Sequence, residues 1–281
     1  MTACRVDESP PAATGKESAC QIREPTSVEA RFGLHSCNPR GEDSHSDIEL
    51  GDWALDDRGQ VQAGVLAVLA DHTLGEVPFL RRPPATWAVT TELTIDFARP
   101  AEPGETLHAR ATPTRMEQGG GLVHGVITDA DESVAALATT RCVFVPATRD
   151  APPPPAPGVK TDQTATSITE HLGLAPVVGD AGVGLQLRDV DSWVNDFGIL
   201  HGGIWTCMTE TAAAAAVSEQ NQKLSTAQIK TVFFRSAPLG ATVNVYASPI
   251  HVGGRFAVVE VSGHTDDGTL CTKSTVTFRG V

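Results

Sequence analysis

The chain is poor in the features that bind nucleic acid, metal clusters or membranes. It has 21 basic residues against 34 acidic ones, a net charge of −13, whereas nucleic-acid backbones are held by clustered Lys and Arg. None of its six cysteines forms a C-x-x-C pair, the usual spacing for zinc or redox work. There is no long apolar run, and the N-terminus has no basic stretch followed by an apolar one. We therefore expect no nucleic-acid partner, no membrane span and no metal, with reduced cysteines in the cytoplasm.

What the chain does have is an internal repeat, the strongest indicator of its architecture. Residues Asn195–Glu210 read N-D-F-G-I-L-H-G-G-I-W-T-C-M-T-E, and residues Asp56–Asp71 read D-D-R-G-Q-V-Q-A-G-V-L-A-V-L-A-D. The two segments align at a spacing of 139 positions, with Gln62 opposite His201. Both segments end on an acidic residue.

Two further blocks repeat in the same order. Ser27–Leu34 matches Ser167–Leu174, and Thr90–Gly104 matches Thr226–Gly240. Their spacings are 140 and 136 positions, a drift that changes in loop length produce. Three matching blocks in one order indicate two copies of one domain rather than chance similarity.

Composition marks where the copies begin and end. Residues 151–160 read A-P-P-P-P-A-P-G-V-K, and such Pro-rich stretches form semi-rigid linkers. The first 24 residues are polar and rich in Pro, Ser and Glu, which favours disorder. We expect a disordered tail at 1–24, a first domain at 25–149, a linker at 150–161 and a second domain at 162–281.

Each copy is expected to hold one buried helix followed by strands. Helix patterns run from Gly64 to about Val77 and from Gly203 to about Gln220, and the second is apolar on nearly all sides, as in a buried helix. It is followed by β-branched runs between turn signals, at Gln228–Arg235, Thr242–Ala247, Phe256–Gly263 and Leu270–Phe278. This order predicts an α+β fold in which a curved antiparallel sheet wraps a long central helix.

The pattern N-x-x-G-x-x-H-G-G-x6-[DE], followed by a T-x6-F-x-R strand, resembles the hotdog thioesterases of the phenylacetate-degradation (PaaI-like) group. The second copy carries the whole pattern over about residues 166–281, whereas the first lacks the His and the first Gly. The resemblance implies a double hotdog whose two repeats form a pseudo-dimer within one chain. It also implies an acyl-CoA thioesterase, with coenzyme A as part of the substrate and no other cofactor, and it is compatible with a homodimer of such chains.

Thioester hydrolysis needs a carboxylate that attacks or activates water, and donors for the developing oxyanion. It needs no strong acid, because the leaving thiol has a pKa of about 8.5, as in free cysteine. Gly202 and Gly203 open a helix, where unpaired amides and the positive end of the helix dipole can bind an oxyanion. Glu210 lies eight residues beyond Gly202, roughly 12 Å away along the helix axis. The acid that serves each helix start is therefore expected from the other repeat, and such shared sites also occur in the resembling family.

Two composite sites follow from this pairing. Site one combines Asn195, His201 and the Gly202 amide with Asp71 and Thr90. Site two combines Asp56, Gln62 and the Ala63 amide with Glu210 and Thr226. The resemblance makes the two acids nucleophiles or general bases, and it makes the two threonines position the water or the acid. Site one is favoured, because Asp56 would place a negative charge beside the oxyanion of site two.

Further residues are candidates for holding the substrate. Gly64 and Gly203 lie at the two helix starts, where small residues allow a close approach. The phosphates of coenzyme A need cationic donors, and the candidates are Arg99, Arg235 and Arg255. The sequence is equally consistent with two structural roles, in which Asn195 stabilises its own turn and His201 caps its helix.

Two other functions compete with thioester hydrolysis. An acyl-thioester hydratase or dehydratase also uses double hotdogs, but its usual D-x-N-P-x-H signature is missing from the chain. A non-catalytic acyl-CoA-binding protein would keep the fold without the chemistry. Retention of both acids, Asp71 and Glu210, favours the enzyme over this second alternative.

Overall fold

The computed structural model describes residues 21–22, 27–38, 43–147, 164–179 and 182–280. Its strands form a single antiparallel sheet of 13 strands, in the order β1-β2-β3-β5-β6-β7-β4-β10-β13-β12-β11-β9-β8. In the first half these are β1 (Gln21–Ile22), β2 (His35–Asn38), β3 (Ser44–Glu49), β4 (Thr86–Phe97), β5 (Thr106–Glu117), β6 (Gly120–Thr128) and β7 (Val134–Pro146). In the second half they are β8 (Leu174–Gly179), β9 (Gly182–Leu187), β10 (Leu224–Phe233), β11 (Val243–Val252), β12 (Phe256–Thr265) and β13 (Leu270–Gly280).

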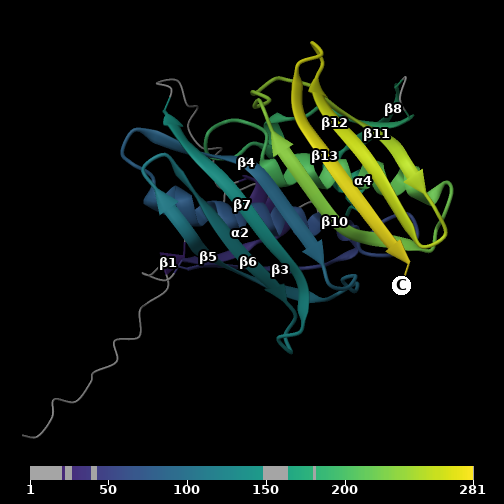
Figure 1. Ribbon diagram of the computed structural model, residues 1–281, viewed down its shortest axis with the longest axis horizontal. Coiled ribbons are helices and arrows are strands. Elements are labelled where there is room, and N and C mark those ends of the chain that lie inside the picture. Colours follow the sequence, from purple (N-terminus) through teal and green to yellow (C-terminus); the bar gives the residue numbers. More distant parts are fainter. Residues whose placement is uncertain (1–20, 23–26, 39–42, 148–163, 180–181, 281) are drawn as a thin grey trace, which may run out of the picture.

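Each half of the sheet covers one long helix. The long helices are α2 (Val65–Arg81), which packs against β3 to β7, and α4 (Gly202–Ser218), which packs against β9 to β13. Figure 1 shows the strands of each half crossing over their own helix. The short helices are α1 (Ser27–Phe32), α3 (Ile168–Leu172) and the 3-10 turns η1 (Asp52–Ala54) and η2 (Asp191–Trp193). The predicted α+β layout of one central helix and an antiparallel sheet in each copy is confirmed.

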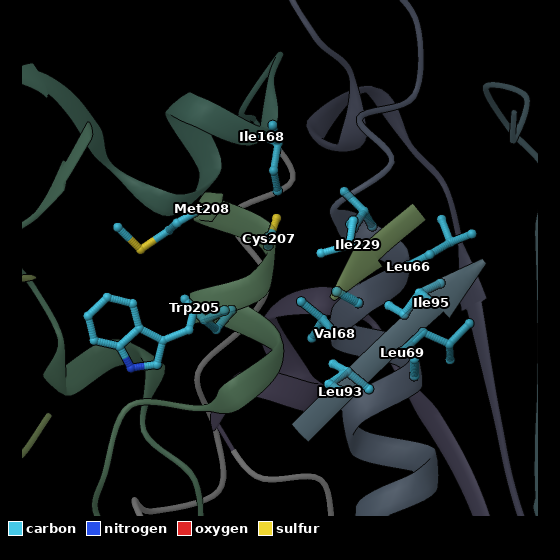
Figure 2. Close-up of a cluster of buried hydrophobic side chains, with 14 of the residues drawn as sticks. Leu66, Val68, Leu69, Leu93, Ile95, Ile168, Trp205, Cys207, Met208 and Ile229 are labelled. Carbon is cyan, nitrogen blue, oxygen red and sulfur yellow. The ribbon is translucent and has the colours of Figure 1, made fainter. Parts of the chain in front are cut away.

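The two halves join through their central strands. β4 pairs with β10, with Ile95 opposite Ile229, so the sheet is continuous across the molecule. Both isoleucines are fully buried, and burial of such side chains stabilises each by roughly 1.5–3 kcal/mol. Figure 2 shows both in one cluster of buried side chains that also includes Val68 of α2 and Cys207 of α4. The core therefore runs from one half into the other.

The two long helices run antiparallel and touch where each begins. A Cβ atom on Gly203 would lie 2.6 Å from the Cα of Val68, and one on Gly64 would lie 2.9 Å from the Cα of Cys207. Backbone at such distances leaves no room for a side chain. Glycine at these two positions thus lets each helix start approach the early turns of the other helix.

The predicted helices are found with shifted ends. Instead of ending near Val77, α2 continues through Pro78 to Arg81. Pro78 gives up one backbone hydrogen bond, and the Arg81 side chain donates to the Val77 carbonyl at 2.9 Å, which satisfies one carbonyl near the helix end. In the second half α4 ends at Ser218 rather than near Gln220.

The predicted N-terminal tail and interdomain linker lie mainly outside the residues that the structure describes. Most of the tail at 1–24 and all of the linker at 150–161 lie there, although Gln21–Ile22 form β1 and pair with β2. Among the helices that are described, none is both long and apolar enough to cross a membrane.

Candidate active site

The structure brings Asp71 of α2 to the start of α4, within site one. The Gly203 amide donates a hydrogen bond to Asp71 Oδ2 at 2.8 Å. Thr90 Oγ1, on β4, donates to Asp71 Oδ1 at 3.3 Å. His201 Nδ1 lies 3.2 Å from Asp71 Oδ2. The carboxylate of one half thus lies at the helix start of the other half.

Site two repeats this arrangement with the halves exchanged. The Gly64 amide donates to Glu210 Oε2 at 3.0 Å, and Gln62 Nε2 donates to the same oxygen. Thr226 Oγ1 donates to Glu210 Oε1 at 2.5 Å. Each acid therefore bonds to a helix start and to a threonine, as the repeat predicted.

The amides that bind the acids are one residue further along than the predicted oxyanion donors. Gly203 and Gly64 donate to the carboxylates, whereas Gly202 and Ala63 were predicted to bind the substrate. Neither of these two amides has a hydrogen-bond partner among the residues that the structure describes. Gly202 lines the cavity at site one and Ala63 lines that at site two. Both amides are therefore available to an incoming carbonyl oxygen.

Asn195 and His201 take the structural roles that the sequence left open, and both also line the cavity at site one. Asn195 Oδ1 accepts from the amides of Phe197 at 2.9 Å and Ile199 at 3.4 Å, which holds its turn. His201 is the N-cap of α4, and its Nδ1 accepts from the Gly203 amide at 3.0 Å. Because the cap uses Nδ1, the His201 Nε2 atom is left for another partner.

Burial distinguishes the acid of site two. Glu210 is only 1% exposed. Burial raises the pKa of its carboxyl group, and the hydrogen bonds that it accepts offset this only in part. Glu210 therefore keeps its proton to a higher pH than an ordinary glutamate, so at a given pH a smaller share of the molecules holds the carboxylate that attacks or activates water.

Asp56 lines the cavity at site two and has partners within its own loop. Asp56 was expected to place a negative charge beside the oxyanion of site two, and Arg58 Nη2 lies 2.7 Å from Asp56 Oδ2. Asp56 Oδ1 also accepts from the Arg58 and Gln60 amides at 2.8 and 3.0 Å. These partners offset the charge of Asp56 in part, but that charge still helps to raise the pKa of Glu210. The charge of Asp56 and the burial of Glu210 therefore both distinguish site two.

The cavities at the two sites differ in character. The cavity at site one has a volume of about 410 Å³ and is lined by aromatic and other apolar side chains as well as by Asp71 and Thr90. Trp87 and Phe197 stack in its wall with ring centroids 4.9 Å apart. The cavity at site two has a volume of about 430 Å³ and a more polar lining: Asp56, Arg58, Gln60, Gln62, Arg99, Glu102, Asn221, Ser225 and Thr226. Only site one offers a largely apolar wall for an acyl chain.

The three candidate arginines lie in different surroundings. Arg99 lines the cavity at site two, but it is held in ion pairs with Glu105 at 2.5 Å and Asp129 at 2.7 Å. Arg255 is exposed and lines neither cavity. Arg235 is exposed at the cavity of site one, and its guanidinium has no partner within the described part of the chain. Arg235 is therefore the one best placed to bind a phosphate.

Two residues of site one were not predicted. Glu29 of α1 and His72 of α2 are 5% and 7% exposed and line the same cavity as Asp71. His72 Nδ1 lies 2.9 Å from Glu29 Oε1. Burial opposes the ionisation of Glu29, but the charge and hydrogen bond of His72, with the charge of His201, outweigh it and lower the pKa of Glu29 to about 2. The sequence did contain a sign of them, because the repeat aligns Glu29 and His72 with Thr169 and Thr211, which do not ionise.

Comparison with known proteins gives two family matches. The model of the acyl-CoA thioesterase C-terminal domain matches residues 4–144. The model of the thioesterase superfamily matches residues 197–272. No curated protein sequence matches the chain significantly.

Solved structures share the fold at low sequence identity. The tesB protein of Mycobacterium avium subsp. paratuberculosis is 12% identical, with a TM-score of 0.65 over 90% of this chain and 98% of that one. A 12:0-ACP thioesterase from Umbellularia californica is 8% identical, with a TM-score of 0.61 over 86% and 95%. A conserved protein with a hotdog fold from Alicyclobacillus acidocaldarius is 12% identical, with a TM-score of 0.57 over 92% and 98%. At these identities the likeness establishes the fold alone, which is that of hotdog proteins.

Proposed function

The chain belongs to the thioesterase superfamily and is a thioester hydrolase, and from this premise we propose that it hydrolyses acyl-coenzyme A at site one. We assign residues 25–149 and 162–281 to two hotdog domains that act as a pseudo-dimer within one chain. The single observation that supports the site most strongly is the position of Asp71. It reaches from the first half to the start of α4 in the second, beside the unpaired Gly202 amide.

The geometry suggests how the substrate binds. The acyl group enters the apolar part of the cavity, and its carbonyl oxygen accepts a hydrogen bond from the Gly202 amide. The positive end of the α4 dipole stabilises the negative charge that develops on this oxygen. Arg235, at the cavity, binds a phosphate of coenzyme A.

Asp71 then acts on the carbonyl carbon as a nucleophile or through a water molecule. Thr90 and the Gly203 amide hold the carboxylate in place through its two oxygens, so little ordering is needed during the reaction. When Asp71 takes a proton from water, the hydroxide adds to the carbonyl carbon, the C–S bond breaks, and the acyl group leaves as the free acid. When Asp71 attacks directly, the C–S bond breaks as an acyl–Asp71 anhydride forms, and water then cleaves this anhydride to give the free acid and restore Asp71. In both routes coenzyme A leaves as a thiolate, which needs no strong acid. At site two the raised pKa of Glu210 lowers the share of molecules that hold a carboxylate ready for the same step.

Site two is proposed to be the weaker site. Ala63 takes the place of Gly202 there, and the wall of the cavity is polar. Gln62 takes the place of His201 and donates to Glu210, so it occupies an oxygen of the acid. These differences all reduce the fit of site two to an acyl thioester.

A substrate panel tests the proposed function. The purified chain is given acyl-CoA esters of increasing chain length, together with benzoyl-CoA, phenylacetyl-CoA and an enoyl-CoA, and release of free thiol is followed with a thiol reagent. We expect thiol release from at least part of the panel, with the Asp71→Asn variant as the negative control. Hydration of an enoyl-CoA without thiol release would show a hydratase instead, and binding without either reaction would show a carrier.

A further inference from the structure

Site one contains a cluster of ionisable side chains that site two lacks. Glu29, His72 and His201 line its cavity. The repeat places non-ionisable residues at the equivalent positions of site two: Thr169, Thr211 and Gln62. Site two is built from the same helices and sheet without these ionisable groups, so the fold does not require them. A buried charge that the fold does not require indicates a function.

The three side chains converge from separate elements. Glu29 comes from α1, His72 from α2 and His201 from the start of α4, and all three are buried. One ligating atom from each lies within 4.8 Å of the other two. Two imidazole nitrogens and a carboxylate oxygen form a common ligand set for zinc, with a fourth position left open.

Each histidine is also oriented by a second partner. His72 Nε2 lies 2.6 Å from Ser36 Oγ, which leaves Nδ1 facing Glu29. His201 Nδ1 lies 3.2 Å from Asp71 Oδ2, which leaves its Nε2. Histidines that bind metals almost always donate their other N–H to an oxygen in this way. If His201 Nδ1 carries the proton, the Gly203 amide still has Asp71 as its acceptor.

Glu29 supplies an independent observation. Its Oε2 atom is buried and has no hydrogen-bond partner among the described residues, although its Oε1 atom pairs with His72. A buried carboxylate oxygen without a partner is costly. A cation bound between Glu29 and the two histidines removes that cost.

We propose that Glu29, His72 and His201 bind one divalent transition-metal ion of the zinc type, with its open position toward the cavity at site one. Nitrogen and oxygen ligands in this number suit zinc or cobalt better than magnesium or calcium, which prefer oxygen ligands. No metal was predicted for His201, because its partner ligands lie more than a hundred residues away in the sequence. The ion and the catalytic Asp71 would share His201 as a common neighbour.

Metal binding by the full chain without a histidine tag tests the proposal in the absence of substrate. The protein is dialysed against zinc chloride or cobalt chloride, passed through a desalting column and analysed for metal by mass spectrometry. We expect about one ion per chain and visible absorption of a tetrahedral cobalt centre. Glu29→Gln and His72→Gln should each weaken binding at least about tenfold, a loss typical of a removed contact at a metal site.

Two exposed residues provide matched controls, Glu170→Gln in the second half and His124→Gln on β6, and both should bind metal as the wild type does. If either ligand variant fails to fold, His72→Cys provides a second measurement, because a cysteine ligand gives a thiolate-to-cobalt charge-transfer band. A wild-type chain without bound ion would overturn the proposal. So would folded ligand variants that bind as tightly as the wild type, or a His72→Cys variant without the band.

Discussion

Replacing Asp71 by Asn is expected to lower kcat/KM for acyl-CoA hydrolysis by about 10²–10⁴-fold, the range for loss of a general base. Asn has the size of Asp, and its oxygen can still accept from the Gly203 amide, which donates to Asp71 at 2.8 Å. The fold should therefore persist while the negative charge is lost. Steady-state thiol release at a series of substrate concentrations measures the effect.

The matched variant Glu210→Gln makes the equivalent change in site two. Because that site is proposed to contribute little turnover, kcat/KM should change by less than about threefold, far below the loss of a catalytic base. Equal losses in the two variants would contradict the assignment of turnover to site one. A larger loss of kcat/KM in Glu210→Gln than in Asp71→Asn would assign the activity to site two.

Glu210→Gln should also change the dependence of stability on pH. Burial raises the pKa of Glu210, so its contribution to stability is fully present below the ordinary glutamate pKa of about 4.3. That contribution is lost as the pH rises through the raised value, because the carboxyl group must ionise while buried. Gln has no such proton to lose, and its amide can keep the hydrogen bond to Thr226.

Thermal unfolding at about pH 5 and about pH 8 measures this effect. The Tm of Glu210→Gln minus the Tm of the wild type should increase by at least about 3 °C from about pH 5 to about pH 8. For a chain of this size that is about 1 kcal/mol in the free energy of unfolding. Glu102→Gln, an exposed acid at the same cavity, serves as the control and should show no such growth. If this difference in Tm stays constant or decreases with rising pH, the ionisation of Glu210 does not destabilise the fold.

The internal repeat made much of this site predictable. Alignment of the two copies placed Asp71 opposite Glu210. Because each acid lies too far along its helix to reach the start of that same helix, it was expected at the helix start of the other half. The observed bonds from Gly203 to Asp71 and from Gly64 to Glu210 follow that geometry. The helices and the strands of the second copy were predictable for the same reason, since periodicity and turn residues act locally.

The missed features depend on partners that are distant in the sequence. Glu29 and His72 are 43 positions apart, and only the fold brings their side chains together. Arg99 was expected to bind phosphate, but the fold places Glu105 and Asp129 within reach of its guanidinium. Sequence patterns identify the charged residues, but they do not predict which ion-pair partner each residue has in the folded chain.

Duplication gives the two sites freedom to differ. In a dimer of identical subunits both sites would carry the same residues, whereas here Gly202 and His201 occur at one helix start and Ala63 and Gln62 at the other. The acids differ as well, with Asp71 opposite Glu210. One site can therefore specialise in catalysis while the second chiefly maintains the contact between the helices.

The most direct measurement is a crystal structure of the chain with a non-hydrolysable acyl-CoA analogue. We expect the analogue in the cavity at site one, with its carbonyl oxygen within hydrogen-bond distance of the Gly202 amide. The Asp71 carboxylate should lie about 3–3.5 Å from the carbonyl carbon, or be joined to it through one water molecule. An analogue bound only at site two, or a carbonyl group away from both Gly202 and Asp71, would contradict the shared site.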